Sequence, residues 1–169
     1  MGCARGIAKR VVATSVDNRY FCAMKSNPGT YALILHNRSK DTTHIGRWGQ
    51  IHLEAGYYIY IGSAFGPGGV KARVSRHFRK RKPKHWHIDY LRDILSPVGA
   101  WYTHDGERLE HRWAQLLSDV SGISSIQRFG CSDCNCHSHL FYTSAEPNLA
   151  LFSNIVGSEV ESWLYLPAN

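Results

Sequence analysis

Five side chains spread along the chain have the chemical types that phosphodiester hydrolysis requires. They are Tyr31, Tyr60, Arg73, His77 and Glu110. The guanidinium of Arg73 is a permanent cation whose planar fork matches phosphate oxygens and stabilises developing negative charge. The carboxylate of Glu110 is a hard oxygen ligand, of the kind that holds Mg2+ together with waters and a substrate phosphate. Glu110 is the only carboxylate in this set of five side chains. We therefore expect one metal ion per site, Mg2+ or Mn2+.

A tyrosine is the expected acceptor for the proton of the attacking water. A phenol has an ordinary pKa near 10, so its phenolate costs roughly 4 kcal/mol at pH 7. His77 has an ordinary pKa near 6.5 and would exist in both protonation states, which suits a proton relay. We therefore expect Tyr60 or Tyr31 to take the proton with help from His77. Taken singly, each tyrosine is equally typical of packing between strands.

The positive charge is concentrated in residues 71–92. This segment carries nine lysine and arginine residues against one acid, while the other 147 residues carry eleven against twelve. Such a patch attracts nucleic acid, because neutralised phosphates release their condensed counterions. The residues expected to contact the strand are Lys71, Arg76, Arg79, Lys80, Arg81, Lys82, Lys84, His85, Trp86 and His87. A solvated charged face or a patch for an acidic protein is the alternative, and a structural role for His85 and His87 stays equally open.

Cysteines and histidines cluster near the end of the chain, in the order Cys131, Cys134, Cys136, His137 and His139. Thiolates and imidazoles are the ligands of tetrahedral zinc sites. Such sites usually draw paired ligands from two separated knuckles, however, and no second pair of this kind is present. We therefore favour a tightly turned β segment with buried thiols. Zinc held by Cys131, Cys134, Cys136 and His139 is the alternative.

Length and composition are typical of one globular domain. The chain has 169 residues, of which 43% are hydrophobic, enough for a core. No segment approaches the roughly 18 apolar residues of a membrane helix, and the N-terminus lacks the apolar centre of a signal peptide. We expect a cytoplasmic protein with an N-terminal extension, residues 1–28. A single domain, residues 29–169, follows it and includes the cysteine-rich and C-terminal helical segments.

Strands are predicted where β-branched and aromatic residues alternate in short runs. Residues 30–36, 44–53 and 57–64 predict three successive strands, the second interrupted by glycine, and their order favours an antiparallel meander. In residues 57–64, Tyr58 and Tyr60 share one face of the strand. Tyr57, Ile59 and Ile61 share the other face. Residues 98–104 and 139–143 predict further strands.

Helices are predicted between and after these strands. Val70, Val74 and Phe78 recur every four residues, which indicates a helix that ends before Pro83. The other expected helices cover residues 86–95, residues 105–118 with Asp105 as N-cap, and a short closing helix announced by the capping-box pattern of Ser158 and Glu161. The resulting fold class is α/β, with a small central antiparallel sheet of three or more strands flanked by helices.

The order of the motifs resembles the GIY-YIG nuclease superfamily. The sequences Gly29-Thr30-Tyr31 and Tyr60-Ile61-Gly62 are followed by a helix with Arg73 and His77 and a later helix with Glu110, over residues 29–118. The segments GSAFGPGG, HWHIDYL and RFGCSDCNCHSHLFY further resemble a prokaryotic subfamily of unassigned function, which occurs alone or fused to endonuclease III.

The resemblance implies a GIY-YIG-like fold and a role for each matching residue. Catalytic positions map to Tyr31, Tyr60, Arg73, His77 and Glu110, and the metal-binding position maps to Glu110. The chain departs from the pattern in three places. Thr30 replaces the isoleucine of the first motif, and a Gly-Pro-Gly-Gly insertion lengthens the gap before Arg73. The asparagine that many members carry after the glutamate helix has no evident equivalent, and the cysteine segment occupies that place.

The expected function is therefore a divalent-metal-dependent endonuclease that hydrolyses DNA phosphodiester bonds, in association with DNA repair. One alternative is a non-catalytic module on the same scaffold, which binds nucleic acid or recruits a repair protein and does not need Glu110. Another is a metal-stabilised interaction domain centred on the cysteine segment. The sequence leaves open whether the nucleic acid is DNA or RNA, and whether it is single- or double-stranded.

Overall fold

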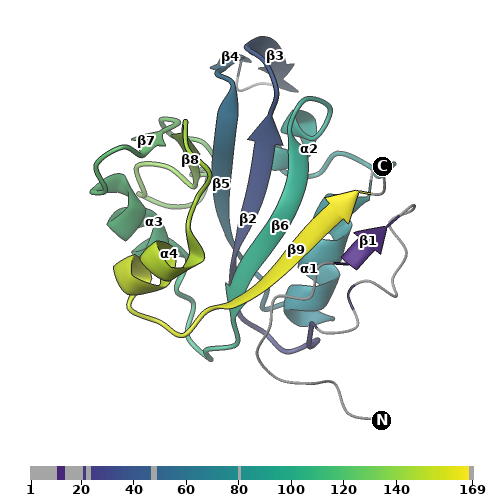
Figure 1. Cartoon of the computed structure of the whole chain (residues 1–169), viewed down its shortest axis with the longest axis vertical. Coiled ribbons are helices and arrows are strands. Elements are labelled where there is room, and N and C mark those ends of the chain that lie inside the picture. Colours follow the sequence, from purple (N-terminus) through teal and green to yellow (C-terminus); the bar gives the residue numbers. More distant parts are fainter. Residues whose placement is uncertain (1–10, 14–20, 22–23, 47–48, 80, 168–169) are drawn as a thin grey trace.

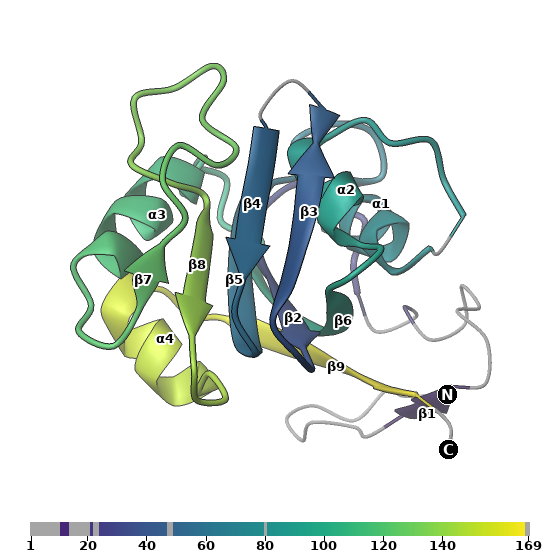
Figure 2. The same cartoon turned by 90° about the horizontal axis from the view of Figure 1, so that it is seen from above.

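A central β-sheet with helices on both faces forms the body of the molecule (Figures 1 and 2). The computed structural model describes residues 11–13, 21, 24–46, 49–79 and 81–167. The strand order is β1-β9-β6-β2-β5-β8-β7, and every pair is antiparallel except β1 and β9. The strands are β1 Val11–Ala13, β2 Thr30–Asn37, β5 Gly56–Ser63, β6 Ser96–Thr103, β7 Ser124–Ser125, β8 Leu140–Thr143 and β9 Glu161–Pro167. The predicted α/β fold with a central antiparallel sheet is confirmed.

Strand β2 lies inside the sheet, because it pairs with β5 along one edge and with β6 along the other. All of its residues except His36 are buried. Its nearly continuous apolar sequence fits this position, since both of its faces are covered by other elements. Tyr31 lies directly opposite Gly62 of β5 and Tyr102 of β6.

Helices pack on both faces of the sheet (Figure 2), and each face has its own hydrophobic core. Helices α1 (Gly69–Phe78) and α2 (His87–Leu91) cover one face, and α3 (Glu110–Ser118) and α4 (Leu149–Val156) cover the other. The alternation predicted for β5 is confirmed: Tyr58 belongs to the core beneath α1 and α2, and Ile59 to the core beneath α3 and α4. The predicted stripe of α1 is also buried, in the first core.

The meander prediction is wrong for residues 44–53. These residues form part of a separate hairpin of β3 (Asp41–Ile45) and β4 (Gly49–Leu53), and β2 pairs directly with β5. The hairpin buries Ile45, Ile51 and Leu53 against the first core, while its intervening polar residues are mostly exposed. A segment that alternates in this way can cover a sheet as well as join it, so periodicity alone did not distinguish the two arrangements.

Two predicted helices are shorter in the structure. Helix α2 ends at Leu91, and the following residues form a turn. Helix α3 begins at Glu110, not at Asp105. Asp105 accepts a hydrogen bond from the backbone N–H of Glu107 and so forms a local turn, which competes with helix formation.

The predicted closing helix is wrong. Helix α4 lies earlier, where Asn148 caps it by accepting the Leu151 N–H, and Gly157 with φ 63° ends it. Residues 161–167 instead form β9, which pairs with β6. Trp163 of β9 packs edge-on against Phe78, so tertiary burial outweighs the local capping pattern.

The described part of the N-terminal extension joins the same body. Val11–Ala13 extend the sheet beside β9, and Phe21 stacks on Trp163 with ring centroids 4.4 Å apart. Met24 is also buried in the first core. The expected boundary at residue 28 therefore does not separate these residues from the core. None of the described helices has the length and apolar character needed to span a bilayer.

Candidate active site

A pocket of about 440 Å3 opens at the free edge of β5. Strand β8 pairs with β5 only as far as Tyr60, whereas β5 continues to Ser63. Residues 60–63 therefore line the pocket, and α1 and α3 reach this edge from the two faces of the sheet. The remaining walls come from residues 85–87 and from the loop of residues 130–139.

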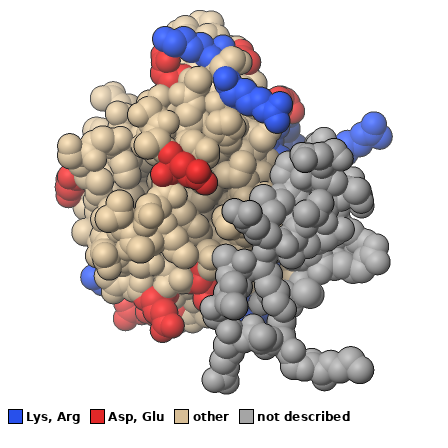
Figure 3. Space-filling model, viewed as in Figure 1, with Lys and Arg blue, Asp and Glu red and all other residues tan. Residues whose placement is uncertain are grey.

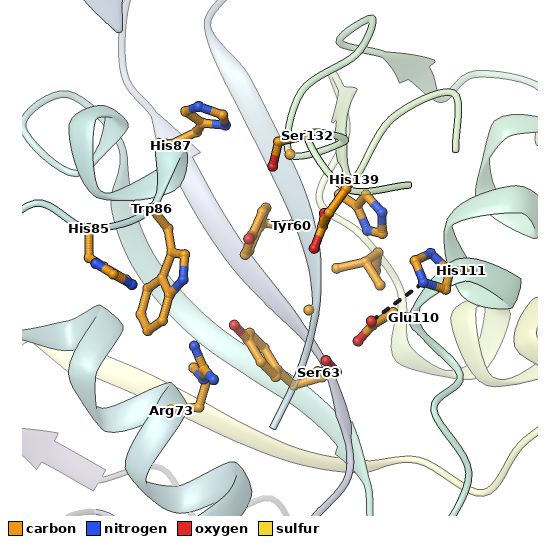
Figure 4. Close-up of a pocket in the computed structure, with 15 residues that line it drawn as sticks. Tyr60, Ser63, Arg73, His85, Trp86, His87, Glu110, His111, Ser132 and His139 are labelled. Atoms are coloured by element: carbon orange, nitrogen blue, oxygen red, sulfur yellow. Dashed lines mark ion pairs between the residues drawn. The ribbon is translucent and has the colours of Figure 1, made fainter. Parts of the chain in front are cut away.

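The pocket gathers four of the five predicted catalytic side chains, namely Tyr31, Tyr60, Arg73 and Glu110. Figure 4 shows Arg73 and Trp86 on one side, Glu110 on the other, and Tyr60 between them. The four residues come from β2, β5, α1 and α3, so tertiary structure alone brings them together. His77 does not line the pocket. It is fully buried, and its Nε2 lies 2.8 Å from the phenol oxygen of Tyr31.

The glycines of the two tyrosine motifs allow close packing around Tyr31. A Cβ atom at Gly62 would lie 2.5 Å from the phenol oxygen of Tyr31, which occupies that space. A Cβ at Gly29 would lie 2.0 Å from the carbonyl oxygen of Thr103 in β6. Both distances are too short for a Cβ atom, so only glycine fits at these two positions.

Thr30 links the first motif to α3. Its buried hydroxyl accepts a hydrogen bond from the backbone N–H of Leu109 at 3.1 Å. Glu110 follows directly and is the first residue of the helix. Thr30 therefore ties β2 to the residue that precedes Glu110 at the start of α3. The positive end of the helix dipole also favours a carboxylate at this position.

Glu110 has the features of a metal ligand. Its side chain is 16% exposed, and its Oε2 is buried with no hydrogen-bond partner among the described residues. Its Oε1 lies 3.6 Å from Nε2 of His111. A buried carboxylate oxygen without a partner is unfavourable unless a cation neutralises it. The pocket also contains a second, exposed carboxylate, Asp133, which sequence reasoning did not single out.

Arg73 stacks on an aromatic ring at the pocket wall. Its guanidinium carbon lies 4.2 Å from the ring centroid of Trp86, and that of Arg76 lies 4.6 Å from the same ring. Such cation–π contacts hold a guanidinium in place without neutralising its charge. No carboxylate among the described residues forms an ion pair with Arg73, so its charge is available to a ligand.

The protonation states of the buried groups follow from burial. Burial, followed by the neighbouring Tyr60, raises the pKa of Tyr31 well above its ordinary value, against the lowering effect of Arg73. Burial likewise raises the pKa of Tyr60. Burial, assisted by the charge of Lys82, holds the pKa of His77 well below its ordinary value. The expectation that His77 is partly ionised at neutral pH is therefore corrected: the imidazole is neutral.

Part of the basic segment is internal. Asp89 is buried, with its Oδ1 2.5 Å from Nζ of Lys82 and its Oδ2 3.1 Å from the guanidinium of Arg76. Burial alone would raise the pKa of Asp89, but hydrogen bonds from Lys82 and from the N–H groups of His85 and Trp86 hold it below its usual range. Lys82, with 7% of its side chain exposed, is therefore a structural partner, and its expected strand contact is corrected.

The other predicted strand contacts differ in exposure. Arg79, Arg81, Lys84 and His85 are exposed, Lys71, Trp86 and His87 are half-buried, and Lys80 lies outside the described residues. Lys84 forms an exposed ion pair with Asp93. In the view of Figure 3, most visible lysine and arginine atoms lie toward the top and right, and several acidic groups lie at the lower left. His85, Trp86 and His87 line the pocket itself.

The cysteine segment contacts α3 beside the pocket. One ligand atom from each of His111, Cys134, Cys136 and His139 lies within 4.8 Å of the other three. Cys131, which the sequence analysis grouped with them, is instead buried and donates to the backbone carbonyl of Phe129. His111 was not assigned a role from the sequence. The only local signal was its position next to Glu110.

The fold and pocket define an α/β protein with a polar cleft at a sheet edge, walled by an arginine, a carboxylate and two tyrosines. The chain belongs to the family described as "Domain of unknown function DUF123", which matches residues 30–161 and thus every residue of the pocket and of the cysteine segment. Comparisons with curated proteins and with solved structures gave no match.

Proposed function

We propose that the protein is a divalent-metal-dependent endonuclease that hydrolyses DNA phosphodiester bonds, with a site of the GIY-YIG type. The observation that carries the proposal is that Arg73 and Glu110 lie in one pocket, on opposite sides of Tyr60. A phosphate placed between them meets a permanent cation on one side and a carboxylate suited to a divalent ion on the other. This combination suits a negatively charged ester whose charge grows in the transition state.

Glu110 is the residue proposed to hold the ion. Its unpartnered, buried Oε2 fits a hard cation such as Mg2+ or Mn2+, which is commonly bound by one carboxylate, waters and substrate phosphate. When bound, the ion supplies Lewis-acid stabilisation of charge on the phosphate. Arg73 contributes from the opposite wall, where its stacking on Trp86 orients the guanidinium toward the pocket before substrate binds.

His77 is proposed as a positioning residue for Tyr31. Because the imidazole is neutral, only one of its ring nitrogens carries a proton, and Nδ1 has no hydrogen-bond partner among the described residues. A buried N–H without an acceptor is less tolerable than a buried lone pair. This favours the tautomer in which Nε2–H donates to the phenol oxygen of Tyr31. The hydroxyl proton of Tyr31 is then free to hydrogen-bond a ligand in the pocket.

Tyr60 is the more exposed of the two pocket tyrosines and the proposed contact of the attacking water. Burial raises its pKa, so it is a neutral hydroxyl in the free protein. It can orient a water by hydrogen bonding, but it can accept the water's proton only if its pKa falls when substrate binds. Arg73 is the residue whose charge already lowers that pKa.

The surroundings of the pocket support a chain-like polyanion as substrate. A second hollow of about 200 Å3, lined by the loop of residues 64–69, shares Arg73 and Trp86 with the main pocket. Exposed Arg79 and Arg81 follow α1 in the chain. An aromatic ring beside arginines can stack on a base while the guanidinium groups contact the backbone.

The proposal includes a cytoplasmic location and a role in DNA repair, beside a repair protein as partner. The described cysteines Cys131, Cys134 and Cys136 form no disulfide, as is usual in a reducing compartment.

Incubation with labelled single-stranded, duplex and branched DNA, and with matching RNA, tests the proposal. We expect DNA cleavage that requires Mg2+ and that falls about 10²- to 10³-fold in Glu110→Gln and in Arg73→Ala. Glu107→Gln, an exposed change just before α3, is the matched control and should cleave like the parent. Circular dichroism and thermal melts verify that the variants are folded.

Two results would contradict the proposal. The first is tight DNA binding by the parent protein with no cleavage of any substrate, which would indicate a non-catalytic module. The second is cleavage by Glu110→Gln at the parental rate. Cleavage of RNA in preference to DNA would correct the substrate.

A further inference from the structure

The loop of residues 130–139 brings two thiols and an imidazole to an imidazole of α3. Nδ1 of His111 lies 3.1 Å from Sγ of Cys136, and Sγ of Cys134 lies 3.3 Å from Nε2 of His139. One ligand atom from each of the four residues lies within 4.8 Å of the other three. We propose that these four side chains hold one structural zinc ion. The inference does not depend on the proposed nuclease activity.

The distances suit a tetrahedral ion. Zinc lies about 2.3 Å from thiolate sulfur and about 2.0 Å from imidazole nitrogen, so ligand atoms around it are about 3.3 to 3.8 Å apart. The two sulfur–nitrogen contacts already lie close to this range, and the widest separation closes with a small movement of the loop. Two thiolates with two imidazoles are a soft donor set that selects zinc over Mg2+. Since protein atoms fill all four positions, the site is closed and structural.

The outer atoms of both imidazoles also match a zinc site. Zinc-bound histidines usually donate their second ring N–H to a carbonyl or a carboxylate, which fixes the tautomer. Burial lowers the pKa of His139, and the backbone of Ile61 counteracts this effect, as a hydrogen-bond acceptor beside the ring does. With Nδ1 of His111 on the metal, its Nε2 carries the proton and lies 3.6 Å from Oε1 of Glu110. The zinc site therefore adjoins the carboxylate that faces the pocket.

The exposure of the thiols separates this site from ordinary core packing. Cys134 and Cys136 are only half-buried, and His111 is exposed, so hydrophobic burial does not explain why they meet. Cys131 is the buried thiol of the segment, and its sulfur lies outside the set of four. The ten-residue loop of residues 130–139 contains no helix or strand that would hold it in place. A bound metal ion stabilises such a loop. In this way zinc links the loop to α3. The same loop carries Ser132 and Asp133 into the pocket.

Metal analysis of the full chain, purified without chelator or histidine tag, tests the inference. We expect close to one zinc ion per chain in the parent, and loss of that zinc in Cys136→Ser and in His111→Asn. His137→Asn is the matched control, because His137 is exposed in the same loop and outside the set of four. Cys131→Ser should also keep its zinc.

Cobalt substitution keeps the test valid if a variant fails to fold. Parent protein stripped by chelator and reloaded with Co2+ should show tetrahedral ligand-field bands and sulfur-to-cobalt charge transfer, and chelation should lower its melting temperature. Parent protein without zinc, iron in place of zinc, an octahedral cobalt spectrum, or zinc loss in His137→Asn would overturn the inference. Zinc loss in Cys131→Ser with retention in His111→Asn would overturn the ligand set. None of these measurements uses DNA cleavage, so the outcome is separate from that of the proposed function.

Discussion

Gly62 leaves the space that the phenol of Tyr31 occupies on the neighbouring strand. In Gly62→Ala, the new methyl group meets the ring, which must move. We expect cleavage to fall about 10²-fold, since small displacements in an active site have effects of this size. The free energy of unfolding should fall by about 1–3 kcal/mol, measured by urea denaturation.

Gly106→Ala is the control for this prediction, because no atom lies within 4 Å of a Cβ at that position and Gly106 lines neither hollow. If the two alanine variants had the same activity and stability, the close contact between Gly62 and Tyr31 would not be a constraint on the site.

The buried imidazole of His77 predicts a pH dependence of stability. Burial holds its native pKa below the value of about 6.5 in the unfolded chain, so the unfolded state binds the proton first as pH falls. The contribution of neutral His77 is complete above pH 6.5 and is lost below it, at up to about 1.4 kcal/mol per pH unit. Between pH 7.5 and 5.5, the parent should lose about 1 kcal/mol more unfolding free energy than His77→Gln.

Urea denaturation at the two pH values measures this difference, and exposed His44→Gln serves as control. An identical loss in the parent and in His77→Gln would show that His77 does not resist protonation in the folded state.

At the scale of elements, the hydrogen bond between Thr30 and Leu109 couples β2 to α3. Thr30→Val keeps the shape of the side chain but leaves the buried N–H of Leu109 without an acceptor. We expect a loss of about 1–2 kcal/mol in unfolding free energy and a lower cleavage rate, because Glu110 begins the same helix. Thr30→Ser retains the hydroxyl and should restore both. Equal stability and activity in the valine and serine variants would contradict this coupling.

The elements that sequence predicts well are those whose pattern is set by local residues. The strand at residues 30–37 and the helix stripe of Val70, Val74 and Phe78 follow directly from their runs and spacing. The N-terminus of α3 does not, because its partner, Thr30, lies 79 residues earlier in the chain. Strand β9 was missed for a related reason: the capping pattern at Ser158 is local, whereas the pairing of β9 with β6 is not.

The same distinction applies to the site. Tyr31, Tyr60, Arg73 and Glu110 were named from short motifs, and the structure places them around one pocket. The protonation state of His77 was not predictable, because its burial depends on elements from several parts of the chain. Of the four possible metal ligands, Cys134, Cys136 and His139 were named from the sequence, but His111 was missed because it lies on a helix more than twenty residues before them.

At the scale of the whole molecule, the net positive charge is larger than the charge that exposed, unpaired cations offer to a nucleic acid. Lys82 and Arg76 are engaged with Asp89, which leaves Arg79 and Arg81 among the exposed cations. For about five phosphate contacts, the slope of log affinity against log salt is about -4.5 on duplex DNA. Replacing Arg79 and Arg81 by glutamine should reduce its magnitude by about 1.8.

Binding measured without Mg2+ over a range of salt concentrations checks this value. The control is the charge-matched pair Lys25→Gln and Arg112→Gln, two exposed positions outside the basic segment. A salt dependence that is the same in both double variants would show that the exposed end of the segment does not contact the strand.

Strand β2 has a neighbour on each edge, whereas the loop of residues 130–139 is almost without strand pairing. Backbone amides held between two strands exchange with solvent only when the whole sheet opens, while those of irregular loops exchange through small local openings. The two walls of the pocket therefore differ in local stability against unfolding. We therefore expect the sheet around Tyr31 to unfold last on heating, and the wall formed by the loop of residues 130–139 to open at a lower temperature.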